Sequence, residues 1–399
     1  MPKVNSNILI WARESAGLMK DHAAKRLGFK DGKKRTGVER LEGLEAGEEE
    51  PSRSVLIRMS KQYHRPLLTF YLSAPPRSGS RGQDFRTLPD APLATNEALL
   101  DALIRDVQVR QGLIRSVLLD EDEDYHLGFV GSKNVTDGVD ELLQSIASQL
   151  SLNLELFRAQ KTPNEAFQVL REHCESLGIF VVLIGNLGSY HTDLSAATFR
   201  GFALADKVAP FIIINDNDSR AAWSFTLLHE MVHIWLGQTG VSGGTPSIEI
   251  EQFCNDVASE FLLPASGLSE LQSISGLPWE HILSIIDDFS KTRNVSRSMV
   301  SYKLLRCGYI SNHTWQKLAG HYKDVWEQYL VDKRGKTRSS DNSGGPNYYT
   351  IRRHRLGSAL VHTTARLLSS GLLTTSKAGQ VLGVRPKNVE RVVSNAQAT

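Results

Sequence analysis

The residues with the clearest capacity for chemistry are two histidines, His229 and His233, four positions apart in an apolar stretch. On a helix, residues at this spacing lie one above the other on the same face, so both imidazoles would point at one spot. Zinc sites in proteins are commonly built from such imidazoles. Glu230 stands next to His229 and could act as general base on a water molecule at the metal. The pattern therefore favours metal-assisted hydrolysis of a peptide bond. The alternative is a buried helix whose two histidines only make hydrogen bonds.

A third metal ligand should lie nearby, because catalytic zinc commonly takes three protein ligands and leaves a fourth position for water. Glycines end the first helix, and a second helix is predicted over residues 247–263. Glu251 is the best-placed acid on it, since Asn255 follows one turn later and could orient a histidine. Glu249 is the second candidate. For either glutamate the alternative is a solvated surface charge.

Five segments between residues 199 and 264 carry a family resemblance; they are Arg200–Asp206, Pro210–Asn215, Phe225–His233, Glu251–Ala258 and Leu262–Pro264. Together they resemble the ImmA/IrrE family of metallo-endopeptidases. The resemblance implies that His229, His233 and Glu251 hold Zn²⁺ and that Glu230 is the catalytic acid/base. Val257 departs from the family pattern, which usually has an aromatic residue there; this changes packing and leaves the ligands untouched.

Two short apolar runs precede the predicted zinc helix, at 179–184 and 210–215, and residues 199–204 between them alternate more weakly; all three are typical of β-strands. A small sheet beside the helix offers an edge strand that can hold an extended peptide by main-chain hydrogen bonds. Tyr190 and His191, in a loop between strands, are candidates for stabilising the oxyanion, with exposed loop residues as the alternative. We expect a mainly α protein with a small β-sheet (α+β). The resemblance implies a zincin-like, gluzincin-type peptidase core.

Residues 1–76 are predicted to form a helical module, because helical stretches alternate with glycines there. The module also resembles the Xre-type helix-turn-helix regulators, which implies DNA binding. However, segment 28–38 is longer than the usual turn, and Glu39, Glu42 and Glu45 on the third helix would repel phosphates. The alternative is a degenerate module that contacts proteins. The fragments that carry this resemblance are Ala12-Arg13, Ala16-Gly17, Ala23-Ala24, Leu27, Leu44–Gly47, Pro51 and Arg65–Leu67.

Composition and turn residues divide the remainder of the chain. We assign residues 84–270 to the peptidase domain and 271–332 to a helical extension. Residues 333–347 are basic and rich in glycine and serine, which favours a linker. Residues 348–399 form a C-terminal helical region. With the arginines at 352, 353 and 355, this region could contact DNA. The alternative is that it packs on the catalytic core or on a partner.

The composition narrows the classes of function. A net charge of +2 over 399 residues is too small to argue for nucleic acid or membrane. The three cysteines are scattered and form no CxxC motif, which fits a reducing cytosol; Cys254 is expected to be a small buried apolar residue. The sequence has no apolar run long enough to span a membrane, and no signal peptide is evident at its start, so we expect a cytoplasmic protein.

These patterns lead to three hypotheses. The first is a regulatory zinc endopeptidase that cuts a protein; the family resemblance implies that its substrate is a helix-turn-helix transcriptional repressor. The second is a DNA-binding transcriptional regulator or antitoxin-like protein with a non-catalytic zinc site. The intact Glu230 favours the first, because a structural zinc site needs no general base. The third is a digestive peptidase, against which the lack of a secretion signal argues.

Overall fold

The computed structural model describes residues 4–76, 94–121, 126–189, 192–239, 248–274, 276–339 and 347–394. The chain divides into two compact units. Helix α5 (Ala94–Asp120) contributes residues to both. The first unit comprises Met1–Ser80, Arg86–Gln108 and Asn186–Phe199, and the second comprises Arg81–Phe85, Val109–Gly185 and Arg200–Thr399.

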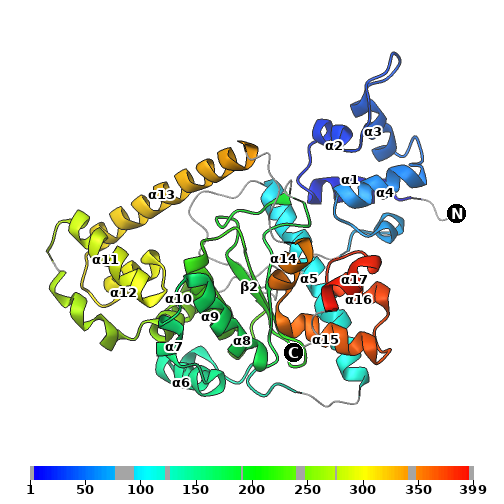
Figure 1. Ribbon diagram of the computed structural model, residues 1–399. Coiled ribbons are helices and arrows are strands. Elements are labelled where there is room, and N and C mark those ends of the chain that lie inside the picture. Colours follow the sequence, from blue (N-terminus) through cyan, green and yellow to red (C-terminus); the bar gives the residue numbers. More distant parts are fainter. Residues whose placement is uncertain are drawn as a thin grey trace. The chain divides into compact units, whose positions relative to one another are not determined.

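Short helices build the N-terminal part of the first unit (Figure 1), close to the stretches that the sequence predicts. Gly17, Gly28 and Gly47 follow three of them with positive φ, a conformation that ends helices and that glycine adopts without strain. Thr36 and Glu39 form a capping box at the start of the third. The helices share an apolar core. They are α1 (Ser6–Ser15), α2 (Lys20–Arg26), α3 (Gly37–Glu45), α4 (Arg53–Gln62) and the 3-10 helix η1 (Leu67–Tyr71).

The second unit is organised around a three-stranded sheet of β1 (Phe180–Leu183), β2 (Gly201–Leu204) and β3 (Phe211–Ile214). β3 lies in the middle, parallel to β1 and antiparallel to β2, so β1 and β2 are the edges. Every residue of the three strands is buried, which explains why β1 and β3 read as continuous apolar runs in the sequence. The prediction of a mainly α fold with a small sheet is confirmed.

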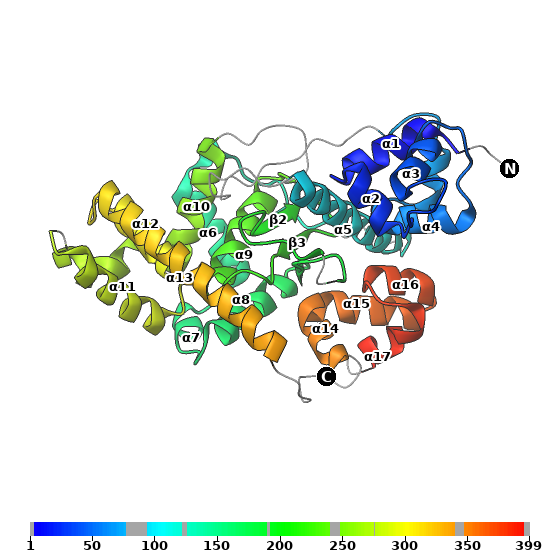
Figure 2. The same ribbon diagram turned by 90° about the horizontal axis from the view of Figure 1, so that it is seen from above.

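Helices α8 (Pro163–Ser176) and α9 (Arg220–Trp235) pack on one face of this sheet (Figures 1 and 2). Val181, Ala203 and Ile212, one from each strand, share a single apolar core with both helices. Helix α10 (Ile248–Leu262) packs along α9. The other helices before the C-terminal region are η2 (Val135–Asp137), α6 (Val139–Leu150), α7 (Leu154–Arg158), η4 (Ala265–Ile274), α11 (Trp279–Arg293), α12 (Arg297–Arg306) and α13 (Asn312–Ser339).

Helix α13 is longer than the sequence predicts, because it continues through residues 333–339, the first half of the expected linker. Glycine and serine suggested a break, but this stretch contains one glycine and no proline, and its lysines and arginines are good helix formers. Residues 340–346, the rest of that linker, lie outside the described residues. In the described part of the chain, no helix is both long and apolar enough to cross a bilayer.

The C-terminal region packs beside β1 and α8. Arg352 and Arg353 donate to main-chain carbonyls at the end of α16 and within α17, and Arg355 pairs with Asp216, in the turn before α9, at 2.7 Å. Arg355 thus joins this region to the turn before α9, whereas Arg352 and Arg353 hold the helices of the region itself together. The region consists of α14 (Tyr348–Leu356), α15 (Ser358–Ser369), α16 (Thr375–Val381), η5 (Pro386–Asn388) and α17 (Val389–Val393).

Candidate metal centre

Helix α9 runs through the apolar core and carries the two histidines and the glutamate of the motif. Apart from Phe225, every residue from Ala222 to Trp235 is buried. A helix that is enclosed on all sides in this way belongs to the interior of a protein. Gly131 and Lys133 donate their main-chain N–H groups to carbonyls in its last turn, which satisfies groups that a helix end leaves open. The motif is therefore held on a rigid, buried element.

Helix α10 brings a second set of polar side chains to α9. Glu251, Cys254, Asn255 and Ala258 recur at the spacing of one helix face. The first three contact the motif histidines, and Ala258 is fully buried. The side of α10 that carries Glu251 and Asn255, which the sequence predicts to hold the third ligand, therefore lies against the motif.

Three buried side chains converge between the two helices. The Nε2 atoms of His229 and His233 lie 3.2 Å apart. Glu251 places Oε2 at 3.2 Å from the first of these nitrogens and Oε1 at 3.4 Å from the second. A tetrahedral zinc with bonds of about 2.0–2.1 Å separates its ligand atoms by about 3.3–3.4 Å. The three measured separations, of which the two to Glu251 involve its two different oxygens, are therefore close to the separations between the ligand atoms of a tetrahedral zinc site.

One oxygen of this group supports the same conclusion. Oε2 of Glu251 is buried and, among the described residues, has no hydrogen-bond partner, although Nε2 of His229 is only 3.2 Å away. Buried polar atoms normally find such a partner. The two atoms are close without the direction of a hydrogen bond, as expected when both are aimed at a common third point. A divalent cation at that point would satisfy both.

The electrostatics favour a cation in this position. Burial disfavours the ionised carboxyl of Glu251, but the close contacts and charges of His229 and His233 outweigh burial and hold its pKa well below the usual range. Burial likewise disfavours a charged His233, yet Cys254, Glu251 and Glu230 raise the pKa of its imidazole well above the ordinary value. Negative charge is thus concentrated where the donor atoms converge.

The remaining catalytic candidate, Glu230, is buried beside the first residue of β2. A Cβ atom on Gly201 would lie 3.0 Å from Oε1 of Glu230 and 2.6 Å from the side chain of Thr226. Glycine is what allows this edge strand to approach the helix so closely. The carboxylate of the motif therefore lies next to the strand edge that could hold a peptide. Tyr190 and His191, the oxyanion candidates, lie outside the described residues.

The other acids of α10 do not join the cluster. Glu249, the second candidate for the third ligand, is exposed. Asp256 and Glu260 lie on the opposite face of the helix, where they pair with Arg306 and Lys303 of α12. These ion pairs hold the opposite face of α10 against α12. Glu251 is therefore the acid of this helix that reaches both histidines.

The contact that Cys254 makes is not evident from the sequence. Cys254 is a small buried residue, as expected, but its sulfur lies 3.9 Å from Nδ1 of His233. Together with His229 and His233 it forms an alternative set of donors that all lie within 4.8 Å of one another. The contacts of Glu251 are shorter, 3.2 Å from Oε2 to His229 and 3.4 Å from Oε1 to His233, which favours Glu251 as third ligand. The signal that could have revealed Cys254 is its spacing, one turn after Glu251.

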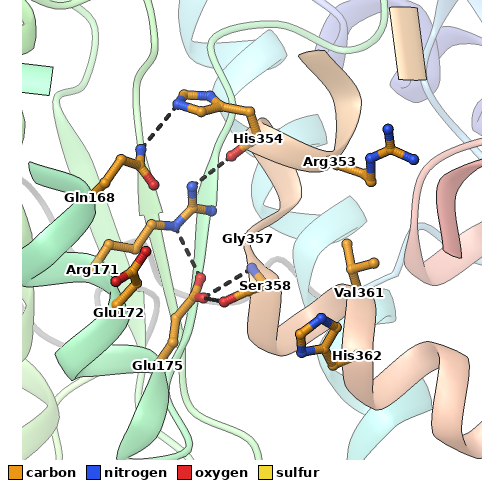
Figure 3. A pocket seen from close by; sticks show the side chains of 10 residues that line it. All are labelled: Gln168, Arg171, Glu172, Glu175, Arg353, His354, Gly357, Ser358, Val361 and His362. Atoms are coloured by element: carbon orange, nitrogen blue, oxygen red, sulfur yellow. Dashed lines mark hydrogen bonds and ion pairs between the residues drawn. The ribbon is translucent and has the colours of Figure 1, made fainter. Parts of the chain in front are cut away.

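A second cluster of charged side chains lies in the same unit, in a cleft of about 280 Å³ between α8 and the C-terminal helices (Figure 3). Arg171 and Glu175 of α8 form a buried ion pair at 3.0 Å. Arg171 also donates to main-chain carbonyls in β1 and at the end of α14. Glu175 accepts the N–H groups of Ser358 and Ala359 at the start of α15. The pair thus joins the C-terminal helices to α8.

Residues 174–304 match the family model Peptidase_M78, the IrrE N-terminal-like domain. The match extends from the end of α8 through the sheet, α9 and α10 into α12, and it contains all four candidate site residues. It covers less than half of the chain, and residues 1–173 and 305–399 lie outside it. The resemblance inferred from the sequence is confirmed for this segment. Comparisons with curated proteins and with solved structures give no match.

Proposed function

Residues 174–304 form an IrrE N-terminal-like peptidase domain, and from this premise we propose that the protein is a zinc-dependent endopeptidase. The observation that carries the proposal is the convergence of His229, His233 and Glu251 at the spacing of a tetrahedral zinc site. The supporting observation is Glu230, which is buried and whose charge acts on His233, because a purely structural zinc needs no general base.

Each side chain has a defined part in the proposed hydrolysis. His229, His233 and Glu251 would hold the ion, and a zinc ion bound there supplies Lewis-acid activation of a water molecule and of the scissile carbonyl. Glu230 accepts the proton of the attacking water and passes it to the leaving amine. Burial of Glu230 excludes bulk water, which strengthens its electrostatic interactions with the reacting groups.

The proposed substrate is a protein segment that lies in extended conformation along β2. At the other edge of the sheet, the carbonyl of Val181 in β1 already accepts a hydrogen bond from Arg171, whereas β2 begins next to Glu230. An added strand at β2 would therefore bring its main chain to the site of reaction. Following the family resemblance, we propose that the substrate is a helix-turn-helix transcriptional repressor; the scattered cysteines fit an enzyme that works in the reducing cytoplasm.

Replacing the general base tests this proposal. Wild-type protein should hold about one zinc per chain. Glu230→Gln should keep the metal and lower cleavage by about 10²–10⁴-fold. Glu249→Gln, on the exposed side of α10, is the matched control and should cleave like wild type. The readouts are metal content and a discrete product band after co-expression with candidate repressors. Full cleavage by the Glu230→Gln variant would show that the proposed mechanism is wrong.

A second proposed activity is DNA binding by residues 1–76. The observation that favours it is that Glu42 and Glu45 pair with basic residues of the same unit, which offsets their repulsion of phosphates. Lys30, Lys33 and Lys34 are exposed. Changing these three lysines to glutamate should weaken binding to duplex DNA and flatten its dependence on salt. Unchanged binding in a gel-shift titration would argue for the alternative, a module that contacts proteins.

A further inference from the structure

The thiol of Cys254 is buried beside the candidate metal centre without belonging to its donor triangle. Its side chain has no exposed surface, and its sulfur lies 3.9 Å from Nδ1 of His233. The other ring nitrogen of that histidine, Nε2, is the one that faces His229 and Glu251. The sulfur therefore contacts the imidazole on the side away from the convergence point.

The neighbouring residue makes the equivalent contact to the other histidine. Asn255 places Oδ1 at 2.9 Å from Nδ1 of His229. Cys254 and Asn255, one turn after Glu251 on α10, thus contact the Nδ1 atoms of both histidines, which lie on the ring side away from the convergence point. Histidines that bind a metal through one ring nitrogen almost always donate the N–H of the other to a supporting acceptor.

We propose that Cys254 is a positioning residue: its sulfur accepts the Nδ1–H of His233 and so keeps the Nε2 lone pair directed at the metal. This inference rests on the proposed metal centre. A neutral imidazole carries one N–H. If the thiol instead donated its hydrogen to Nδ1, the N–H would lie on Nε2, which could then bind no cation. The sulfur must therefore be the acceptor whenever His233 is a ligand, and Asn255 has the same part for His229.

The alternative is that the thiolate is itself a ligand, because the His229, His233 and Cys254 donors lie within 4.8 Å of one another. The two possibilities differ in a property that does not depend on catalysis. A thiolate bound to cobalt(II), which replaces zinc at such sites, gives a charge-transfer band in the near ultraviolet, and a sulfur that only contacts the ring does not. Removing a supporting group typically weakens metal binding by about 10–100-fold.

The test measures zinc affinity, by competition with a chromophoric chelator, and the spectrum of the cobalt(II) protein. Cys254→Ala should bind zinc about tenfold more weakly, because sulfur is a weak acceptor and its loss should fall at the lower end of that range. Cys254→Ser should restore most of the affinity, because the hydroxyl oxygen can accept the same N–H. The matched control is Cys174→Ala. Cys174 is equally buried in the same core but contacts the sulfur of Met231, so its loss should leave zinc affinity unchanged.

Two results would overturn the inference while leaving the metal centre intact. One is a Cys254→Ala variant that binds zinc as tightly as wild type. The other is a charge-transfer band in wild-type cobalt protein that disappears in Cys254→Ala, which would make the thiolate a ligand. Wild-type protein that binds neither metal would overturn the proposed centre, and this inference with it. Weaker binding in Cys254→Ala, rescue by serine and no such band would support the positioning role.

Discussion

Two buried clusters of ionisable side chains lie in the second unit, and they differ in how their polar atoms are satisfied. At the pair formed by Arg171 and Glu175, guanidinium and carboxylate bond to each other and to the main chain of β1, α14 and α15. At the candidate metal centre, the histidine nitrogens and the Glu251 oxygens lie 3.2–3.4 Å apart, and Oε2 has no hydrogen-bond partner among the described residues.

The difference separates a structural cluster from a binding site. Where each charged group is matched by a main-chain partner, a ligand would have to displace bonds that hold helices together. Where buried donor atoms converge and a carboxylate oxygen, here Oε2 of Glu251, has no hydrogen-bond partner among the described residues, part of the desolvation cost stays uncompensated until something binds. Burial and charge are similar in the two clusters; the directions of the hydrogen bonds tell them apart.

Replacing the glutamate of each cluster by glutamine is expected to give the largest difference between the two clusters. Glu175→Gln should lower the free energy of unfolding by about 3–5 kcal/mol, because it leaves Arg171 buried without its counter-ion. Glu251→Gln should cost the metal-free protein less stability than this, because His229 and His233, unlike Arg171, can lose a proton when the carboxylate is removed, and it should weaken zinc binding by more than the roughly 100-fold typical of a supporting group. Denaturant titration and metal competition measure the two effects. If Glu175→Gln and Glu251→Gln lowered the free energy of unfolding equally, the two clusters would not differ as described.

The turn that connects α14 and α15 should be nearly as sensitive. Gly357 has φ +84°, and a Cβ there would lie 2.0 Å from Oε1 of Glu175 and 2.8 Å from the carbonyl oxygen of Val181. Gly357→Ala should therefore lose about 1–3 kcal/mol from backbone strain alone, with the steric clash adding to that. Gly320→Ala, in the middle of α13 with open space around it, is the control and should cost nothing. Similar melting temperatures for the two variants would contradict this account of the turn.

The smallest effect is expected at the support of His229. Asn255→Ala should weaken zinc binding by about 10–100-fold, because Nδ1 then loses its acceptor at 2.9 Å. Asp256→Asn, one residue further along α10 and directed at α12, should leave the affinity within about twofold, since it touches neither histidine. A chelator competition assay separates them. If Asp256→Asn weakens binding as much as Asn255→Ala, the effect comes from loosening α10 as a whole.

Much of the architecture could be predicted because it depends on local signals. The three strands and the second site helix, predicted over residues 247–263, agree with the structure within a few residues. The predicted end of α13, at residue 332, was wrong. Glycine and serine in this basic stretch do not interrupt the helix, because the neighbouring lysines and arginines are strong helix formers. The partners of the three C-terminal arginines could not be predicted, because their acceptors are carbonyls and a carboxylate far away in the chain.

For the site, the sequence by itself determined that His229 and His233 share one face of a helix with Glu230 beside them, because helical periodicity is a local property. The tertiary structure decided which acid completes the group. Four acids lie on α10, and only its packing between α9 and α12 turns Glu251 inward and pairs Asp256 and Glu260 outward. It also placed the Cys254 sulfur behind His233. Contacts between residues far apart in the chain arise from packing, which no local pattern encodes.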